Sequence, residues 1–309
     1  PYRYGHAIWA YIGQKWGDEV IGTILQATMT GGIEQAFRRV LGVSLDQLSN
    51  EWRDAVQTWY LPQIAEHQKA RQFARVVLDK KQSGGTLHVA PQISPDGRRI
   101  VYLSERNFFF VDLYIADAES GKVDRRLIRS SFDPSFETLR FVNSTGSWSA
   151  DGTRFAIAVK SGDQDNLVIL DVPNNRVVGR YRLGLNAVLN PTWAPDGSRI
   201  AFTGSEGGIS DLYVVDSDGQ NLRRLTNDRH ADLTPSWSPD GSTIAFTTDR
   251  GPGTDFNVLR FGNLRLALYH LDTDSIELLP EMAVGKNVNP VWAPDGRSLA
   301  FVSDRGGID

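Results

Sequence analysis

Residues 237–250 read Trp-Ser-Pro-Asp-Gly-Ser-Thr-Ile-Ala-Phe-Thr-Thr-Asp-Arg, a tight turn followed by an apolar strand. Proline sets φ near the value that the first corner of a type I turn requires. Aspartate accepts hydrogen bonds from the neighbouring backbone, and glycine adopts the positive φ that closes a hairpin with a bulge. The stretch therefore predicts a β-hairpin.

The same turn and strand occur five times. The turn aspartates are residues 96, 151, 196, 240 and 295, so successive copies are 55, 45, 44 and 55 residues apart. Each copy predicts four short antiparallel strands: one before the turn, one after it, one that ends in Asp, and a closing strand. The residues of the structural repeat are Asp96, Gly97, Trp148, Asp151, Gly152, Trp193, Asp196, Gly197, Trp237, Asp240, Gly241, Trp292, Asp295 and Gly296.

Four antiparallel strands per recurrent unit are typical of a β-propeller, in which each blade buries its faces against its neighbours. We expect a mainly β fold with five recognisable blades, the fifth only begun, and we expect residues 75–78 to supply the closing strand of the last blade. The chain starts without Met and ends part-way through a repeat, so we expect it to be a piece of a longer polypeptide.

Residues 1–70 have a different pattern and predict an α-helical domain, which leaves 72–309 for the propeller. Ile33, Ala36, Phe37, Val40 and Leu41 form an apolar stripe at helical spacing. Gly42 then stands where a helix C-cap is expected, and residues 44–47 have the form of a capping box at the start of the next helix.

Composition excludes several classes of function. The formal net charge is −4 and the calculated pI is about 5.8, so no basic surplus points to nucleic acid or to an anionic membrane surface. The chain has no cysteine, which excludes disulfides and thiolate metal sites. No apolar run reaches about 18 residues, the length at which a membrane-spanning helix becomes a candidate.

The order Trp-Ser-Pro-Asp-Gly, Ile-Ala-Phe, Asp-Leu-Tyr-Val and Arg-Arg-Leu-Thr resembles the WD-like repeats of TolB-type propellers, and the resemblance covers roughly 72–309. It implies a ring that has six blades when complete. It also implies a bacterial periplasmic or otherwise extracytoplasmic location, contacts with envelope proteins, and no enzymatic activity.

The helical part is similar to the C-terminal helices of gluzincin-type metallopeptidase domains. The similarity lies in residues 11–17, in 36–48 and in Glu51-Trp-Arg53. The His-Glu-x-x-His zinc motif is missing, and the five scattered histidines cannot reproduce its i, i+4 pair. The resemblance implies a peptidase-like remnant, and it leaves open the alternative that the chain is the regulatory propeller and C-terminal fragment of a metallopeptidase.

No other motif points to catalysis or to a cofactor. A nucleophile elbow, a P-loop and a dinucleotide fingerprint are all missing from the sequence. The Asp163–Asp165 and Asp272–Asp274 pairs lack the ligand spacing of a known calcium loop, which favours turn chemistry. We therefore predict no enzymatic activity, no cofactor, no metal and no catalytic residue.

Loop length separates the two ends of the predicted propeller. The connections after the first and third strands are short, whereas those after the second and fourth strands are long and irregular. In the fourth blade about 12 residues are inserted at 251–262. Long loops on a rigid scaffold commonly carry binding residues. Candidate protein contacts in or near these loops are Phe108, Phe109, Phe110, Phe132, Phe136, Phe256, Arg260 and Phe261.

Two interpretations of these aromatic side chains stay open: they contact another protein, or they fold back onto the chain itself. The sequence favours a non-catalytic interaction or scaffold module, which serves as an accessory subunit of a bacterial envelope or membrane-associated complex. The expected partners are other proteins of such a complex. The sequence predicts no nucleic-acid partner and no membrane span.

Overall fold

The computed structural model describes residues 2–65, 70–107, 110–129, 138–139, 144–161 and 164–306. The chain divides into two compact units, residues 1–75 and 76–309. Within the described residues, no helix combines the length and the apolar character that a membrane crossing requires.

The first unit is helical. Its elements are α1 (Tyr2–Trp16), α2 (Glu19–Leu41), α3 (Leu45–Ala65) and the short 3₁₀ helix η1 (Ala70–Gln72). Its buried apolar core joins all three long helices through Tyr11, Ile12, Ile24, Phe37, Leu41 and Leu48. Partly buried side chains extend this core at helical spacing, because Ile8 and Ile12, Val20 and Ile24, and Leu45 and Leu48 lie three or four residues apart.

The link between α2 and α3 confirms the predicted caps. Gly42 adopts φ +74° and donates its N–H to the Arg38 carbonyl oxygen. The Gln47 N–H donates to Ser44 Oγ at 3.1 Å, and the Ser44 N–H donates to Gln47 Oε1 at 3.4 Å, which completes a capping box.

One member of the predicted α2 stripe is misplaced. Ala36, Phe37 and Leu41 are buried as expected, but Ile33 is 60% exposed. Gly32 lies immediately before it with φ +75° and ψ 170°, which are not helical angles. The helical rotation is therefore interrupted at Gly32, and the spacing argument does not carry Ile33 into the core.

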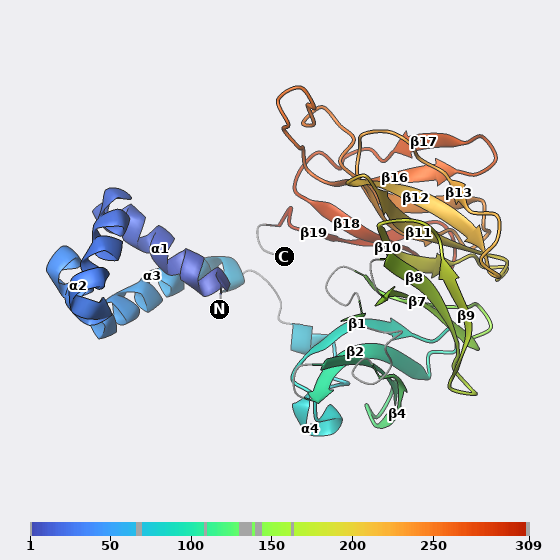
Figure 1. Cartoon of the computed structure of the whole chain (residues 1–309), viewed down its shortest axis with the longest axis horizontal. Helices are drawn as coiled ribbons and strands as arrows, with labels where there is room; N and C mark the ends of the chain where they lie inside the picture. Colours follow the sequence, from blue (N-terminus) through green and yellow to red (C-terminus); the bar gives the residue numbers. More distant parts are fainter. Residues whose placement is uncertain are drawn as a thin grey trace. The chain divides into compact units, whose positions relative to one another are not determined.

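The described strands of the second unit form five antiparallel sheets that follow one another in chain order, from teal β1 to red β19 (Figure 1). The first blade contains β1 (His88–Ile93), β2 (Arg99–Asn107), β3 (Phe110–Asp117) and β4 (Val123–Ile128). The second contains β5 (Thr138–Leu139), β6 (Ser147–Trp148), β7 (Arg154–Ser161), β8 (Gln164–Asp171) and β9 (Arg176–Arg182). In this blade β5 and β6 both pair with β7 and together occupy the place of one inner strand.

The remaining blades repeat the same order. The third contains β10 (Ala187–Trp193), β11 (Arg199–Glu206), β12 (Ile209–Asp216) and β13 (Arg223–Arg224). The fourth contains β14 (Asp232–Trp237), β15 (Thr243–Thr248), β16 (Arg265–His270) and β17 (Ser275–Leu278). The fifth contains β18 (Asn287–Trp292) and β19 (Leu299–Ser303). Four complete blades and one begun blade are what the repeat predicts.

Four inner strands share an irregularity that the repeat pattern does not reveal. In each one the register shifts just before a proline, and the residue before that proline has a positive φ near 50°. These residues are Ala90, Asn190, Thr234 and Asn289. A bulge of this kind bends the strand and increases its twist locally.

Packing between blades follows a single rule. The innermost strand of each blade lies against the sheet before it, for example β10 against β7 and β8 and β14 against β11 and β12. Phe155, Phe202 and Phe246 follow the turns of blades two to four and are at most 1% exposed. The repeated Trp-turn-strand unit therefore supplies the apolar layer between neighbouring blades.

The prediction for residues 75–78 is wrong. Val76 to Leu78 form no strand, and Val77 and Leu78 pack against Ile100 and Tyr102 of the first blade. The segment continues into the helix α4 (Lys80–Ser83), which has Asp79 as its N-cap and Gly84 as its C-cap. Gly121 fixes the contact because a Cβ atom there would lie 1.9 Å from the Val77 carbonyl oxygen. A short apolar run alone does not distinguish a strand from an extended packing segment.

Candidate functional site

The long connection of the fourth blade, residues 251–262, folds as a small hairpin, which we call the insert hairpin. It joins β15 to β16, where the third blade has only Gly207 and Gly208. The Asp255 N–H donates to the Arg260 carbonyl oxygen at 2.8 Å, and the Arg260 N–H donates to the Asp255 oxygen at 2.9 Å. Residues 256–259 therefore form the tip of a paired turn.

Thr254 closes the base of the insert hairpin. Its hydroxyl donates to the Asp249 carbonyl oxygen at 2.5 Å and accepts the Gly262 N–H at 3.0 Å. No side chain fits between the two arms, because a Cβ atom on Gly253 would lie 3.0 Å from the Gly262 Cα atom. These contacts hold the arms together without a large core.

Phe256 anchors the tip to the preceding inter-blade loop. Its ring meets the His230 ring edge-on at 4.9 Å, and the Arg229 guanidinium lies 4.6 Å from its centroid. His230 in turn lies 3.0 Å from Asp249 through Nδ1. An aromatic contact and a cation–π contact of this kind each contribute about 0.5–1.5 kcal/mol, so the insert hairpin is docked on its own propeller.

The same hairpin presents an exposed apolar surface. Val258 and Leu259 are each 68% exposed, and Phe261 is 64% exposed. The Asn287 N–H, at the start of β18, donates to the Leu264 carbonyl oxygen at the base of the hairpin. We call Val258, Leu259 and Phe261 the apolar tip. Exposed apolar side chains that gather on a rigid support are typical of a protein contact surface.

The predicted contact residues are in different situations. Phe256 is half-buried and serves as the anchor, whereas Phe261 belongs to the apolar tip. Arg260 is exposed, and its Nε donates to the Gly253 carbonyl oxygen at 3.2 Å. Phe110 begins β3, and Phe108, Phe109, Phe132 and Phe136 lie outside the described residues.

Reasoning from the sequence missed Val258 and Leu259. The length of the insert locates the loop. The candidates within it were chosen for aromatic or charged side chains, so its aliphatic side chains were not considered. The signal that was available is local: Val258 and Leu259 stand in a connection bounded by Gly253 and Gly262, where a core-facing strand is not expected.

The repeated turn residues hold the blades and form no cluster at the apolar tip. Asp240 Oδ1 accepts the Ser242 N–H at 3.0 Å and the Ser238 hydroxyl at 2.5 Å, while Gly241 adopts φ +72°. These hydrogen bonds, with that from Ser238 the strongest, lower the pKa of Asp240 below its usual value. The other four copies have a positive φ at Gly97, Gly152, Gly197 and Gly296.

One member of each acidic pair that was weighed as a calcium candidate has a protein partner. Asp165 is 1% exposed and accepts the Val188 N–H at 3.0 Å, and Asp274 accepts the Tyr269 hydroxyl at 2.9 Å. In the described part of the chain, no three histidine, aspartate or glutamate side chains gather in a metal-binding group.

Comparison with known proteins agrees with this architecture. Residues 145–263 match the family described as TolB beta propeller domain. The Tol-Pal system protein TolB of Anaeromyxobacter dehalogenans is 47% identical over 57 residues, which make up 18% of this chain and 12% of that relative. An uncharacterised protein of Agrobacterium fabrum is 25% identical over 212 residues, or 68% of each chain.

Solved structures show the same fold. A putative TolB from Agrobacterium tumefaciens has a TM-score of 0.55 at 23% identity and covers 71% of this chain and 75% of that one. TolB from Acinetobacter baumannii has a TM-score of 0.55 at 21% identity and covers 74% of this chain and 54% of that one. The strand-rich unit of this chain is therefore a TolB-like β-propeller.

Proposed function

We propose that this chain is a non-catalytic interaction module that binds another protein through the apolar tip of its propeller. The observation that carries the proposal is the insert hairpin, which is closed by Thr254 and docked by Phe256 but leaves Val258, Leu259 and Phe261 exposed. Such a surface is already ordered before it binds, so little conformational entropy is lost on association.

The likeness to TolB supports a bacterial envelope setting for this module. The relative with 47% identity is named a Tol-Pal system protein, and the TolB-like fold is consistent with protein binding without catalysis. We therefore propose a periplasmic or otherwise extracytoplasmic accessory subunit of an envelope or membrane-associated complex. Its partner presents an apolar groove that accommodates two aliphatic side chains and one phenylalanine.

Photo-crosslinking in the cell tests the proposal. A photo-reactive amino acid replaces Leu259 in one version of the protein and Val178 in another. Val178 lies on β9 of the second blade and is 43% exposed, so it is a matched apolar control away from the insert hairpin. We expect a discrete crosslinked protein from position 259 and none of the same mass from position 178.

A triple variant, Val258→Ser with Leu259→Ser and Phe261→Ser, then measures affinity for the protein identified. Residues that dominate an interface cost about 2 kcal/mol or more each when truncated, so we expect at least a hundredfold weaker binding. The double variant Val177→Ser with Val178→Ser should bind normally. Equal binding by the triple variant and the wild type would refute a role for the apolar tip.

We propose that the helical domain, residues 1–70, is a peptidase-like remnant that accompanies the propeller at 72–309. Under the alternative, the chain is the regulatory propeller and C-terminal fragment of a metallopeptidase, and the zinc-binding part would belong to the same polypeptide. The gene sequence upstream of the Pro1 codon distinguishes the two, because a His-Glu-x-x-His motif encoded there would favour the alternative.

A further inference from the structure

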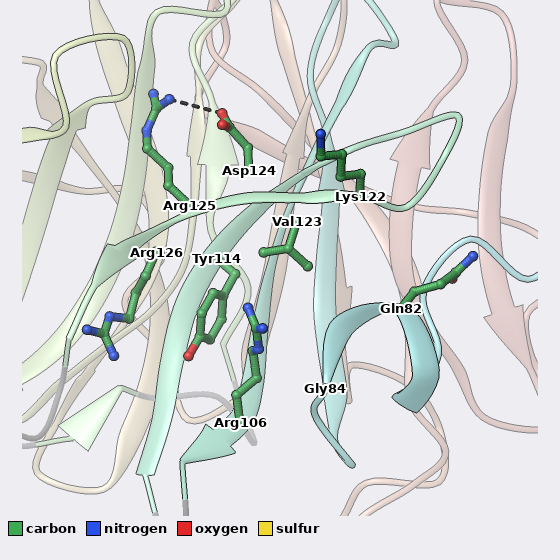
Figure 2. A pocket seen from close by; sticks show the side chains of 9 residues that line it. All are labelled: Gln82, Gly84, Arg106, Tyr114, Lys122, Val123, Asp124, Arg125 and Arg126. Atoms are coloured by element: carbon green, nitrogen blue, oxygen red, sulfur yellow. Dashed lines mark hydrogen bonds and ion pairs between the residues drawn. The ribbon is translucent and has the colours of Figure 1, made fainter.

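A second site lies on the first blade, far along the chain from the insert hairpin. It is a pocket of about 570 Å³ between the outer strand β4 and the α4 segment. Tyr114 and Val123 form apolar surface in it, and Gln82 and Gly84 line the side that belongs to the α4 segment (Figure 2). Ligand pockets commonly measure about 300–1,000 Å³.

The pocket carries an unbalanced positive charge. Arg106, Lys122 and Arg126 all line it. Arg126 contacts the buried Asp112 at 3.2 Å, whereas neither Arg106 nor Lys122 forms an ion pair with any described residue. The Arg106 guanidinium instead lies 5.1 Å from the centroid of the Tyr114 ring, and the two side chains stand side by side in Figure 2.

The two other charged residues of the lining neutralise each other. Asp124 contacts Arg125 at 3.0 Å, and this is the one pair that a dashed line joins in Figure 2. Asp124 also contacts Arg99 at 3.2 Å, and Arg125 donates through Nη2 to the Val172 carbonyl oxygen at 2.7 Å. Asp124 is therefore already bound by two arginines and is not free to balance Arg106 or Lys122.

The third blade provides an internal comparison. Arg224 stands opposite Tyr213, just as Arg126 stands opposite Tyr114. The buried carboxylates correspond too, because Arg224 contacts Asp211 at 2.5 Å and Arg126 contacts Asp112. The two blades therefore share a Tyr-Arg-Asp arrangement, which by itself is a feature of the repeat.

The blades differ at one neighbouring position. In the third blade Asp211 of β12 pairs with Gly204 of β11, and Glu206 lies two residues after Gly204. In the first blade Asp112 of β3 pairs with Ser104 of β2, and Arg106 lies two residues after Ser104. Glu206 lies 3.9 Å from Arg224, so the third blade supplies its own second carboxylate. In the first blade an arginine takes the place of that glutamate, and Lys122 adds another cation.

We infer that this pocket binds a phosphomonoester. Among the described residues, Asp112 balances one of the three cations Arg106, Lys122 and Arg126 and leaves two positive charges without a partner. A phosphomonoester carries about −1.5 to −2 charges at pH 7 and three acceptor oxygens, whereas a carboxylate group supplies a single charge. Guanidinium groups match phosphate oxygens through paired N–H donors. The volume beyond one phosphate lets the organic part of the ligand lie on Tyr114 and Val123.

Calorimetric titration of the whole chain at low ionic strength tests this site. The probes are inorganic phosphate and glycerol 3-phosphate, with succinate as a dicarboxylate comparator. Vesicles of phosphatidylcholine with and without phosphatidic acid distinguish a lipid headgroup from a soluble phosphate ester as the source of the ligand. We expect saturable binding of the phosphate probes and weaker binding of succinate.

The decisive variant is Arg106→Glu, which places the residue of the third blade into the first. Loss of a charge-assisted contact together with a repulsive charge should weaken phosphate binding at least tenfold, which corresponds to about 1.4 kcal/mol. Arg106→Gln should bind phosphate with intermediate affinity. It also tests the site if the charge reversal in Arg106→Glu prevents folding. Arg182→Glu, an equal charge change at an exposed position of β9, should leave binding unchanged.

Three results would overturn the inference. The first is the absence of saturable phosphate binding by the wild type. The second is equal affinity of the wild type and both Arg106 variants for phosphate, which would place any binding elsewhere. The third is succinate binding as tight as phosphate binding, which would refute the assignment of ligand class. Binding to phosphatidic acid vesicles or to glycerol 3-phosphate supports the inference and identifies the source.

Discussion

The indole Nε1 of Trp237 donates a hydrogen bond to the main-chain oxygen of Thr192, 3.1 Å away on the inner strand of the preceding blade. Trp148 contacts the Gln92 oxygen at 3.1 Å in the same way, and Trp292 contacts the Ser236 oxygen at 3.2 Å. Each of these three tryptophans therefore links two blades through one hydrogen bond in addition to its apolar packing. Trp193 is the exception, because its buried Nε1 has no described hydrogen-bond partner.

This difference gives a matched pair of variants. Trp237→Phe removes a hydrogen bond and leaves the Thr192 carbonyl oxygen without that donor, whereas Trp193→Phe removes a donor that has no acceptor. Both tryptophans are 6% exposed, so the loss of packing is similar. We expect Trp237→Phe to be more destabilising by about 1 kcal/mol or more.

Urea unfolding followed by far-ultraviolet circular dichroism, with the midpoint of each variant compared with that of the wild type, measures the difference. Equal midpoints for the two variants would show that the inter-blade hydrogen bond contributes no net stability.

Much of this architecture can be predicted from the sequence, because the same turn occurs five times and its proline, aspartate and glycine each favour a hairpin for a physical reason. The inner-strand bulges do not follow as easily. Asn190 and Asn289 each precede a proline and adopt positive φ, which asparagine tolerates, but Ala90 adopts the same conformation with no local sequence signal. The blade geometry imposes that conformation on Ala90, and only the three-dimensional comparison of the blades reveals it.

Ala90→Asn should therefore stabilise the first blade. Ala90 has φ +52°, and a left-handed conformation costs a residue other than glycine or asparagine about 1–2 kcal/mol. Asparagine is the residue that the third and fifth blades place at this position. We expect a gain of about 0.5–1 kcal/mol, since part of the strain persists in asparagine. The matched control is Asn289→Ala, which should lose a similar amount in the same urea experiment.

The candidate site was only partly accessible from the sequence. The fourth blade has more residues between its turn and the end of its third strand than the other blades have, and this difference locates the insert. Extra residues in a repeat are accommodated in a loop, because the strands that recur in every blade keep their length. It does not reveal that Phe256 turns inward to His230 while Phe261 stays exposed. The basic pocket of the first blade was missed altogether, since Arg106 and Lys122 are separated in the sequence and meet only through the pairing of the strands.

Thr254→Val should loosen the insert hairpin without unfolding the blade. The substitution keeps the shape of the side chain but removes the hydrogen bonds to the Asp249 oxygen and from the Gly262 N–H. We expect faster amide hydrogen exchange within 251–262 and unchanged exchange in β15 and β16. If binding depends on a tip ordered in advance, the same variant should also bind its partner several-fold more weakly.

Thr273→Val is the control for that experiment, because Thr273 bonds only to the exposed Ser275 hydroxyl in the turn after β16. It should leave exchange in the insert hairpin unaltered. Unchanged exchange in Thr254→Val would show that the main-chain pairing of Asp255 with Arg260 suffices to hold the hairpin.

Beneath the insert hairpin, Arg250 forms ion pairs with the buried Asp232 and with Asp228. Burial raises the pKa of Asp232, and the hydrogen bond and charge of Arg250 oppose that rise. Arg250→Gln removes the opposing charge and leaves a carboxylate buried without a cation. Breaking a buried pair in this way costs about 3–5 kcal/mol at neutral pH.

The stability deficit of Arg250→Gln should depend on pH, and its direction follows from the raised pKa of Asp232. A carboxyl group whose pKa is raised in the folded state is tolerated while protonated, and the fold loses stability as pH rises through that pKa. Arg250→Gln should therefore be most destabilised at neutral pH and should recover toward wild type on mild acidification. Urea midpoints measured across this range check the trend. The double variant Asp232→Asn with Arg250→Gln should lose the pH dependence, because it has no buried carboxylate left to protonate; a pH-independent deficit in the single variant would contradict this mechanism.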